Sequence, residues 1–179
     1  MCGMVDDLPD VIIRPATVDD AEQIAAVHIA SWREAYAGAV PEEYLARMDV
    51  HERATRWQSV LESSARDDIQ VWVAEDEEDG HVVGFASVGP SRDEDAERTT
   101  VEIYTIYLEP AAWGRGVARR LMRTLLEHVP AGATVTLWVL STNERAHHFY
   151  RRHGFMADGV ERLSPYDHEQ LREIRFVRR

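Results

Sequence analysis

The sequence predicts a mixed α/β fold in which one sheet carries helices on both of its faces. At 179 residues the chain has the length of one domain, which buries about 70% of the surface of the unfolded chain. Strand-like and helical patterns follow one another in the order strand, helices, three strands, helix, strand, helix, two strands. No internal repeat or low-complexity linker interrupts them. We therefore expect one domain over residues 11–179, preceded by a flexible tail over residues 1–10.

The first part of the chain is expected to form one strand and three helices. Residues 11–13 are apolar, and Pro15 ends this strand before Asp19 and Asp20 place negative charge at the start of a helix, where it is favourable. The helices are predicted from Asp19 to about Gly38, over residues 41–45 and over about residues 52–61.

The remaining elements follow from alternation and from turn residues. Residues 69–74 and 82–88 flank an acidic loop and predict a hairpin. A second acidic segment leads into a long strand over residues 99–108, and a helix over residues 116–128 follows, with Val117, Leu121 and Leu125 on its buried face. The last elements are predicted at residues 135–140 (strand), 143–153 (helix), and 155–163 with 174–177 (an antiparallel strand pair).

Composition excludes several classes of function. The formal net charge of −12 disfavours nucleic acid as a partner. The apolar run over residues 82–88 is too short to cross a membrane, and the N-terminus has acidic residues where a secretory signal needs a basic flank. We therefore expect a cytoplasmic protein without a membrane partner. Cys2 is the single cysteine, so it could at most link two chains, and a homodimer remains open.

The charge is unevenly distributed along the chain. Residues 111–155 contain seven arginines and two glutamates, a net charge of +5, so the rest of the chain carries −17. This asymmetry suits a polyanionic cofactor in one region and a cationic acceptor in another. Solvated helix faces of opposite sign are the alternative interpretation.

A glycine–arginine–glycine turn, Gly114 to Gly116, connects the long strand to the following helix. Glycines let the backbone approach a ligand closely, and the free N–H groups at the start of a helix bind anions. Many such connections contain glycine for conformational reasons alone. A dinucleotide-binding turn would have glycine at the position of Arg119, and a phosphate-binding P-loop needs a lysine, which this chain lacks.

A second motif, over residues 143–155, makes the turn more specific. Together the two segments resemble the GNAT superfamily of acetyl-CoA-dependent N-acetyltransferases. The cofactor loop of that family reads Arg/Gln-x-x-Gly-x-Gly/Ala, and a later helix carries Asn, a Tyr seven residues on, and Gly-Phe. Here the loop is WGRGVA, in which Trp113 replaces the family's Arg or Gln, and the later signature is Asn143, Tyr150, Gly154 and Phe155. Residues 12–38 also look like the opening of small bacterial members.

The resemblance implies a mostly antiparallel sheet with one splayed parallel strand pair, and acetyl-CoA as co-substrate. It assigns the pantetheine arm to Ile106, Tyr107 and Leu108, and a cofactor hydrogen bond to Asn143. The diphosphate would be held by Gly114, Arg115, Gly116, Val117, Ala118 and Arg119. Asn143 is also a favoured residue for capping the following helix, which alone could explain it.

Glu102 is the candidate general base. It is a carboxylate within an apolar strand, and alternation places it on one face with Tyr104 and Ile106. Burial raises the pKa of a carboxyl group towards neutrality, which suits proton transfer from an ammonium acceptor, directly or through water. Some family members have their base at this position, whereas others have a glutamate where Trp138 stands. A solvent-facing or substrate-anchoring role is the alternative.

Tyr150 is the candidate general acid. Its neutral phenol could protonate the departing thiolate, although a core tyrosine would fit the same pattern. Trp32 and Tyr36 stand one helical turn apart and share a face, so they either wall the acceptor pocket or pack in the core. His147, His148 and His153 lack the spacing of a metal site, so we expect no metal.

The sequence thus predicts transfer of an acetyl group from acetyl-CoA to a primary amine, by direct attack within a ternary complex. The acceptor is expected to be a small and possibly cationic amine, because of the acidic remainder of the chain. Two alternatives remain open: a non-catalytic acyl-CoA-binding sensor, and an acetyltransferase acting on protein N-termini.

Overall fold

The computed structural model describes residues 11–166 and 169–179, so the predicted tail over residues 1–10 lies outside the described part. The strands are β1 (Val11–Pro15), β2 (Gln70–Asp76), β3 (Val82–Pro90), β4 (Val101–Leu108), β5 (Val135–Leu140), β6 (Met156–Tyr166) and β7 (Glu169–Arg178). The helices are α1 (Ala21–Ala35), α2 (Glu42–Arg47), α3 (Val50–Ser63), α4 (Val117–His128) and α5 (Glu144–Arg152). Short 3-10 turns lie at Val18–Asp20 and Pro110–Ala112.

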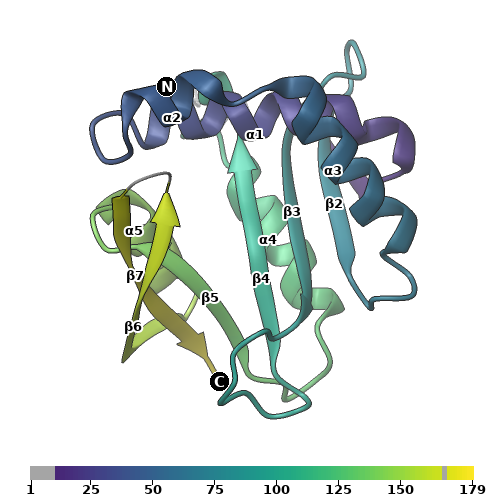
Figure 1. The fold of residues 1–179 in the computed structure, drawn as a ribbon. Helices are drawn as coiled ribbons and strands as arrows, with labels where there is room; N and C mark the ends of the chain where they lie inside the picture. Colours follow the sequence, from purple (N-terminus) through teal and green to yellow (C-terminus); the bar gives the residue numbers. More distant parts are fainter. Residues whose placement is uncertain (1–10, 167–168) are drawn as a thin grey trace, which may run out of the picture.

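The seven strands form one sheet in the order β1-β2-β3-β4-β5-β7-β6 (Figure 1). β4 and β5 pair in parallel, whereas the other neighbouring pairs are antiparallel. The predicted fold class, a mostly antiparallel sheet with one parallel pair, is confirmed. No helix among the described residues is both long and apolar enough to cross a membrane.

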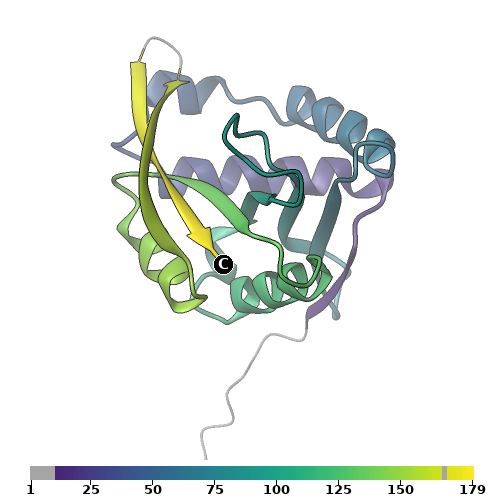
Figure 2. The same ribbon diagram turned by 90° about the horizontal axis from the view of Figure 1, so that it is seen from below.

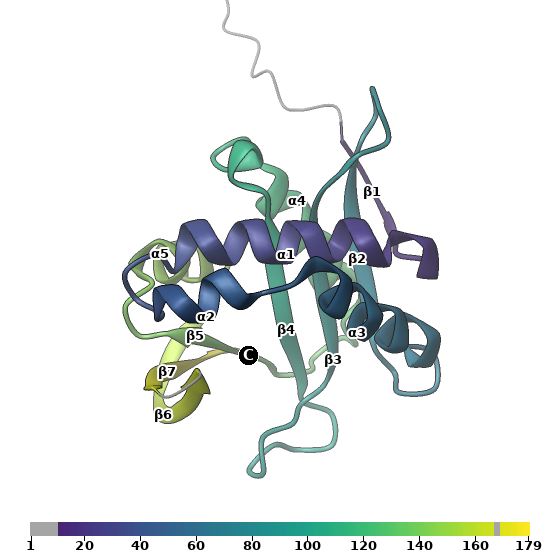
Figure 3. The same cartoon turned by 45° about the horizontal axis from the view of Figure 1, so that its top comes forward.

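Helices cover both faces of the sheet. α1 runs across the strands, with α2 and α3 beside it (Figure 3), and its residues Ile24 and Val27 pack with Trp57 of α3 against Phe85. α4 covers the opposite face, where the predicted residues Val117, Leu121 and Leu125 are all buried. The positions that recur at helical spacing therefore face the sheet, as hydrophobic burial requires.

The parallel pair separates soon after it forms. β4 and β5 are paired only from Val101 to Ile103 and from Val135 to Leu137, and beyond these residues the two strands diverge (Figure 1). The splayed pair expected from the family resemblance is therefore present. It leaves the edges of both strands open towards each other, next to the N-terminus of α4.

A β-bulge in β4 changes which side chains share a face. Val88 pairs with Ile103 and Ser87 with Thr105, so Tyr104 is the extra residue. Ile103 and Ile106 consequently both pack against the core under α4. The expectation that Glu102 and Ile106 share a face was wrong, because strict alternation ignores the extra residue.

The acidic connection between β3 and β4 is held by side chains of β5 and β7. Figure 2 shows it, in dark teal, at the end of the sheet where β4 begins. Arg175 of β7 donates to Asp93 at 3.1 Å and to Asp95 at 2.6 Å, and the Trp138 indole donates to Asp93 at 2.9 Å. These contacts hold Arg92 beside the opening between β4 and β5.

The final hairpin is longer than predicted. β7 begins at Glu169 rather than at residue 174, and β6 continues to Tyr166. Most of β6 is exposed, since it is the last strand of the sheet. An exposed strand carries little of the apolar alternation from which strand ends are read.

Candidate active site

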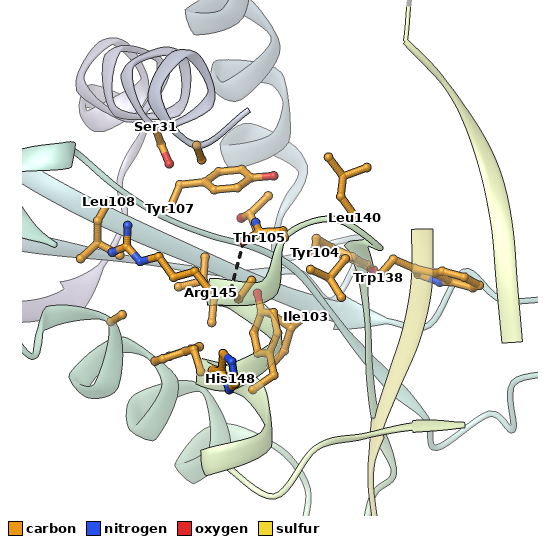
Figure 4. A pocket seen from close by; sticks show the side chains of 18 of the residues that line it. Ser31, Ile103, Tyr104, Thr105, Tyr107, Leu108, Trp138, Leu140, Arg145 and His148 are labelled. Atoms are coloured by element: carbon orange, nitrogen blue, oxygen red, sulfur yellow. Dashed lines mark hydrogen bonds between the residues drawn. The ribbon is translucent and has the colours of Figure 1, made fainter. Parts of the chain in front are cut away.

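A cavity of about 940 Å³ occupies the opening between β4 and β5. This volume lies in the range of about 300–1,000 Å³ that is usual for ligand sites. Figure 4 shows Ser31 and Tyr107 on one side of the cavity and His148 on the other. All the predicted site residues line it except Arg115 and Val117. Arg115 is exposed on the turn, and Val117 is buried in the core.

The glycine turn forms one end of the cavity. Gly114 and Gly116 have φ angles of 76° and 84°, a conformation that favours glycine. Gly116 is the residue before α4, so it has no side chain to cap the N–H groups of the first helical turn, and that turn contains no acidic residue. Arg119 and Arg145 line the same end. Free N–H donors and guanidinium groups together fit a diphosphate.

Trp113, the departure from the family motif, closes the end of β4. Its indole Nε1 donates to the Leu108 carbonyl at 3.1 Å, and the Arg145 guanidinium lies 3.9 Å from the centre of its ring. The tryptophan thus fixes the turn against the strand and holds an arginine beside the cavity by a cation–π contact. The Leu108 carbonyl already has this donor in the protein.

Asn143 and Tyr150 lie on the α5 side of the cavity. The Asn143 side chain accepts from the Ala146 N–H at 3.1 Å, so it caps α5. The Tyr150 ring packs near Phe155 of the core, while its residue lines the cavity. Burial, and then the neighbouring Tyr36, raise the pKa of Tyr150, so its phenol is neutral. No group in the described residues hydrogen-bonds its hydroxyl.

Trp32 and Tyr36 line the cavity from the α1 side. Their ring centres are 4.9 Å apart in an edge-to-face arrangement, and Tyr166 of β6 lies 5.6 Å from Trp32. They also pack against the buried cluster that contains Ile29 and Leu45, so the same two rings form a wall of the cavity and part of the core. The Trp32 indole N–H is buried, and none of the described residues accepts from it with hydrogen-bond geometry.

Glu102 is buried but does not lie in an apolar environment. Its side chain is only 2% exposed. Its Oε1 accepts from the Arg92 guanidinium at 2.7 Å and its Oε2 accepts from the Arg92 backbone N–H at 2.9 Å. The expected apolar surroundings were therefore wrong, because the connection before β4 folds back and supplies a charge partner. The Arg92 guanidinium also lies 4.1 Å from the centre of the Tyr104 ring.

The cavity contains a second buried carboxylate that was not expected from the sequence. Glu173 of β7 lines the cavity and is 8% exposed. It accepts from Arg162 Nε at 2.6 Å, from Ser164 Oγ at 2.6 Å and from the Tyr166 hydroxyl at 3.1 Å. Like Glu102, it is a carboxylate within a strand, which was the available signal. The pattern does not reveal that this face of β7 turns towards the cavity.

The described residues contain no cluster of typical metal ligands. No group of three or more histidine, cysteine, aspartate or glutamate side chains lies close enough there to hold a metal ion. His147, one of the three histidines in the later motif, instead has its Nε2 3.0 Å from the Leu140 carbonyl.

A parallel strand pair that opens in front of a glycine turn and a helix N-terminus defines the N-acetyltransferase class of fold. The family model described as "Acetyltransferase (GNAT) family" matches residues 29–155. The chain therefore belongs to the GNAT acetyltransferase family.

Individual relatives agree with this assignment. The chain is 36% identical over 137 residues to the uncharacterised N-acetyltransferase YuaI of Bacillus subtilis, covering 74% of this chain and 73% of the relative. It is 39% identical over 83 residues to the N-alpha-acetyltransferase RimI of Mycobacterium tuberculosis, covering 46% and 51%. The PaiA N-acetyltransferase of Thermoplasma acidophilum, solved with coenzyme A, shares the fold, with a TM-score of 0.74 at 20% identity over 95% and 99% of the two chains.

Proposed function

We propose that the protein moves an acetyl group from acetyl-CoA to a primary amine, by direct attack of the neutral amine in a ternary complex. The observation that carries the proposal is one cavity that joins the N-terminus of α4, the open edge of β4 and the neutral phenol of Tyr150. Family membership and the coenzyme A bound to the Thermoplasma neighbour support the choice of cofactor. A cytoplasmic location and a homodimer stay predictions.

The residues of the cavity suit the parts of acetyl-CoA. The N–H groups over residues 114–119 would hold the diphosphate, with Arg119 and Arg145 adding charge. The open edge of β4, from Ile106 to Leu108, would pair with the pantetheine amides, and Asn143 would add a hydrogen bond. The thioester supplies an activated acetyl group when it is bound.

Two side chains are proposed to move protons. Tyr150 would protonate the departing thiol, because its raised pKa keeps the proton available. Glu102 would accept the proton of the ammonium group, directly or through water, or else it would anchor the acceptor. Arg92 donates to both carboxylate oxygens of Glu102. This pairing favours proton transfer through water, or the anchoring role, over direct proton transfer from the ammonium group.

A screen of amine acceptors with acetyl-CoA, reading the release of free thiol, tests the proposal. We expect at least one class of primary amine to raise thiol release well above hydrolysis in its absence. Binding of acetyl-CoA without acceptor-dependent release would identify a non-catalytic sensor instead.

A protein N-terminus is the second candidate acceptor, supported by the similarity to RimI over part of the chain. Short peptides with free N-termini belong in the same screen. Preferential turnover of peptides over small amines would select this alternative.

A further inference from the structure

We infer that the acceptor is a zwitterionic amine, such as a neutral α-amino acid, and that Glu173 and Arg162 recognise its ammonium and carboxylate groups. The inference rests on the transferase function proposed above and names the substrate class of that site. It comes from four features of the cavity end that lies away from the glycine turn.

The first feature is the unfilled capacity of Glu173. Its Oε2 accepts from Arg162 Nε and from Ser164 Oγ, both at 2.6 Å. Within the described part of the chain, its Oε1 accepts from the Tyr166 hydroxyl alone, at 3.1 Å. Each carboxylate oxygen can accept about two hydrogen bonds. Oε1 therefore has room for one N–H of an ammonium group, on a residue that lines the cavity.

The second feature is a guanidinium group that is held in place but not saturated. Arg162 is fixed by Glu173 through Nε, and its guanidinium carbon lies 4.1 Å from the centre of the Trp138 ring. Its two Nη atoms have no hydrogen-bond partner in the described residues, and its side chain is 42% exposed. Such a group offers parallel N–H donors that match a carboxylate.

The third feature is the balance of charge at this end. Glu102 is paired with Arg92 and Glu173 with Arg162, so two carboxylates face two guanidinium groups. These four charges sum to zero, so an acceptor with several positive charges and no negative charge would meet as much repulsion as attraction. A zwitterion satisfies both signs at once. The cationic acceptor expected from net charge is therefore disfavoured by the local charges.

The fourth feature is the aromatic wall formed by Trp32, Tyr36 and Tyr166. It offers apolar contact area for an uncharged side chain beside the two polar contacts. A protein N-terminus would place a neutral amide where a free amino acid carries its carboxylate. That amide would give Arg162 no charge to bind.

Matched acceptors test the inference by kinetics. We compare L-phenylalanine with L-phenylalaninamide and phenethylamine, and L-leucine with L-leucinamide, and read thiol release. The free amino acids should exceed their partners by about tenfold or more in kcat/KM, the scale of one hydrogen bond between charged groups. An equal or reversed order, with turnover of the amides or amines, would overturn the inference while leaving the transferase function intact.

Variants locate the effect. Arg162→Gln should raise KM for the amino acids about tenfold or more and change kcat/KM for phenethylamine less than twofold. Arg172→Gln is the matched control, because Arg172 lies in the same hairpin, pairs with Glu161 and does not line the cavity. It should leave both acceptors unchanged. Equal losses for both acceptors in Arg162→Gln would count against recognition of the carboxylate.

Calorimetry separates this inference from the proposed reaction. Protein saturated with coenzyme A, which cannot transfer an acetyl group, is titrated with L-phenylalanine or phenethylamine. We expect binding of the amino acid that is weakened in Arg162→Gln and in Glu173→Gln. If this pattern holds but no amine releases thiol from acetyl-CoA, the transferase function fails and the zwitterion site stands. Absence of amino-acid binding in the parent protein overturns the site.

Discussion

Tyr150 combines two environments that sequence reasoning treated as alternatives. Its ring belongs to the core beside Phe155, and the residue also lines the cavity. A side chain held by its ring and free at its hydroxyl is suited to donate a proton in a fixed direction. The core contacts thus serve as the support for the proposed chemistry.

Tyr150→Phe should lower turnover by about 10²-fold or more, the lower range for a positioned acid or base, while the Kd of acetyl-CoA stays unchanged. Because burial raises the pKa of Tyr150, the parent rate should not fall as pH rises towards 10, where an ordinary tyrosine loses its proton. Steady-state rates and calorimetry measure both effects. Tyr44→Phe, outside the cavity, is the control. Turnover within twofold of the parent would leave Tyr150 a core residue.

Glu102→Gln separates a base from an anchor. The amide keeps the size of the side chain but cannot take up the proton. If Glu102 is the base, turnover falls and recovers at high pH, where the amine acceptor loses its own proton. A raised KM with normal kcat would instead make Glu102 an anchor. The control is Glu109→Gln, because the Glu109 carboxylate lies 3.0 Å from His81. The measurement is the pH–rate profile of each variant.

At the scale of elements, the sequence predicted the start of α4 to within one residue. The predicted helix over residues 116–128 and the observed one, Val117–His128, differ by one residue. Gly116 marks the beginning of the helix, and apolar residues at every fourth position mark the face that is buried against the sheet. Strand β5 was also predicted with both ends correct, at Val135–Leu140, because Gly132 and Asn143 bracket its apolar run.

Gly116→Glu should abolish binding of acetyl-CoA, because it adds bulk and negative charge where phosphates are expected. Gly132→Glu is a matched control. Gly132 has a φ of +78° and open space around it, so it imposes similar backbone strain beyond the other end of α4. Calorimetry at low and high salt should show binding that weakens with salt in the parent and in the control. Unchanged binding in Gly116→Glu would contradict the cradle.

Other elements could not be read from the sequence. The bulge at Tyr104 adds one residue without altering the apolar character of β4, so the face of Glu102 was partly misjudged. The pairing of Arg92 with Glu102 depends on how the connection before β4 folds back. Glu173 and Arg162 meet only because β6 and β7 pair. In each case the information lies in the register between segments, which local patterns do not contain.

On the scale of the whole molecule, His28 links stability to pH. Its ring lies among Trp32, Trp57 and Phe85, and the Trp57 indole donates to its Nδ1 at 3.3 Å. Burial, with a smaller contribution from Arg53, lowers the pKa of His28 from 6.5 to about 3. Between these values the unfolded chain binds a proton that the folded protein excludes, so stability falls as pH falls.

His28→Phe should flatten this dependence. One excluded proton changes the free energy of unfolding by about 1.4 kcal/mol per pH unit, and the variant should lose about that slope between pH 6 and pH 4. It also leaves the Trp57 N–H unpaired, at a cost of about 1–3 kcal/mol at every pH. Urea unfolding measures the slope, with the exposed His51→Gln as control. A slope equal to that of the parent would show that His28 takes up its proton without unfolding.

The divergence of β4 and β5 also gives this sheet an edge in its interior. Edge strands expose backbone groups to which another extended chain can add, but here residues of α1 and α5 and Trp113 line the cavity at this edge. A slender ligand carrying amides, as proposed above for the pantetheine arm, would take the place of the missing strand. The β4 amides that face the gap should therefore exchange with deuterium faster than those from Val101 to Ile103, until such a ligand protects them.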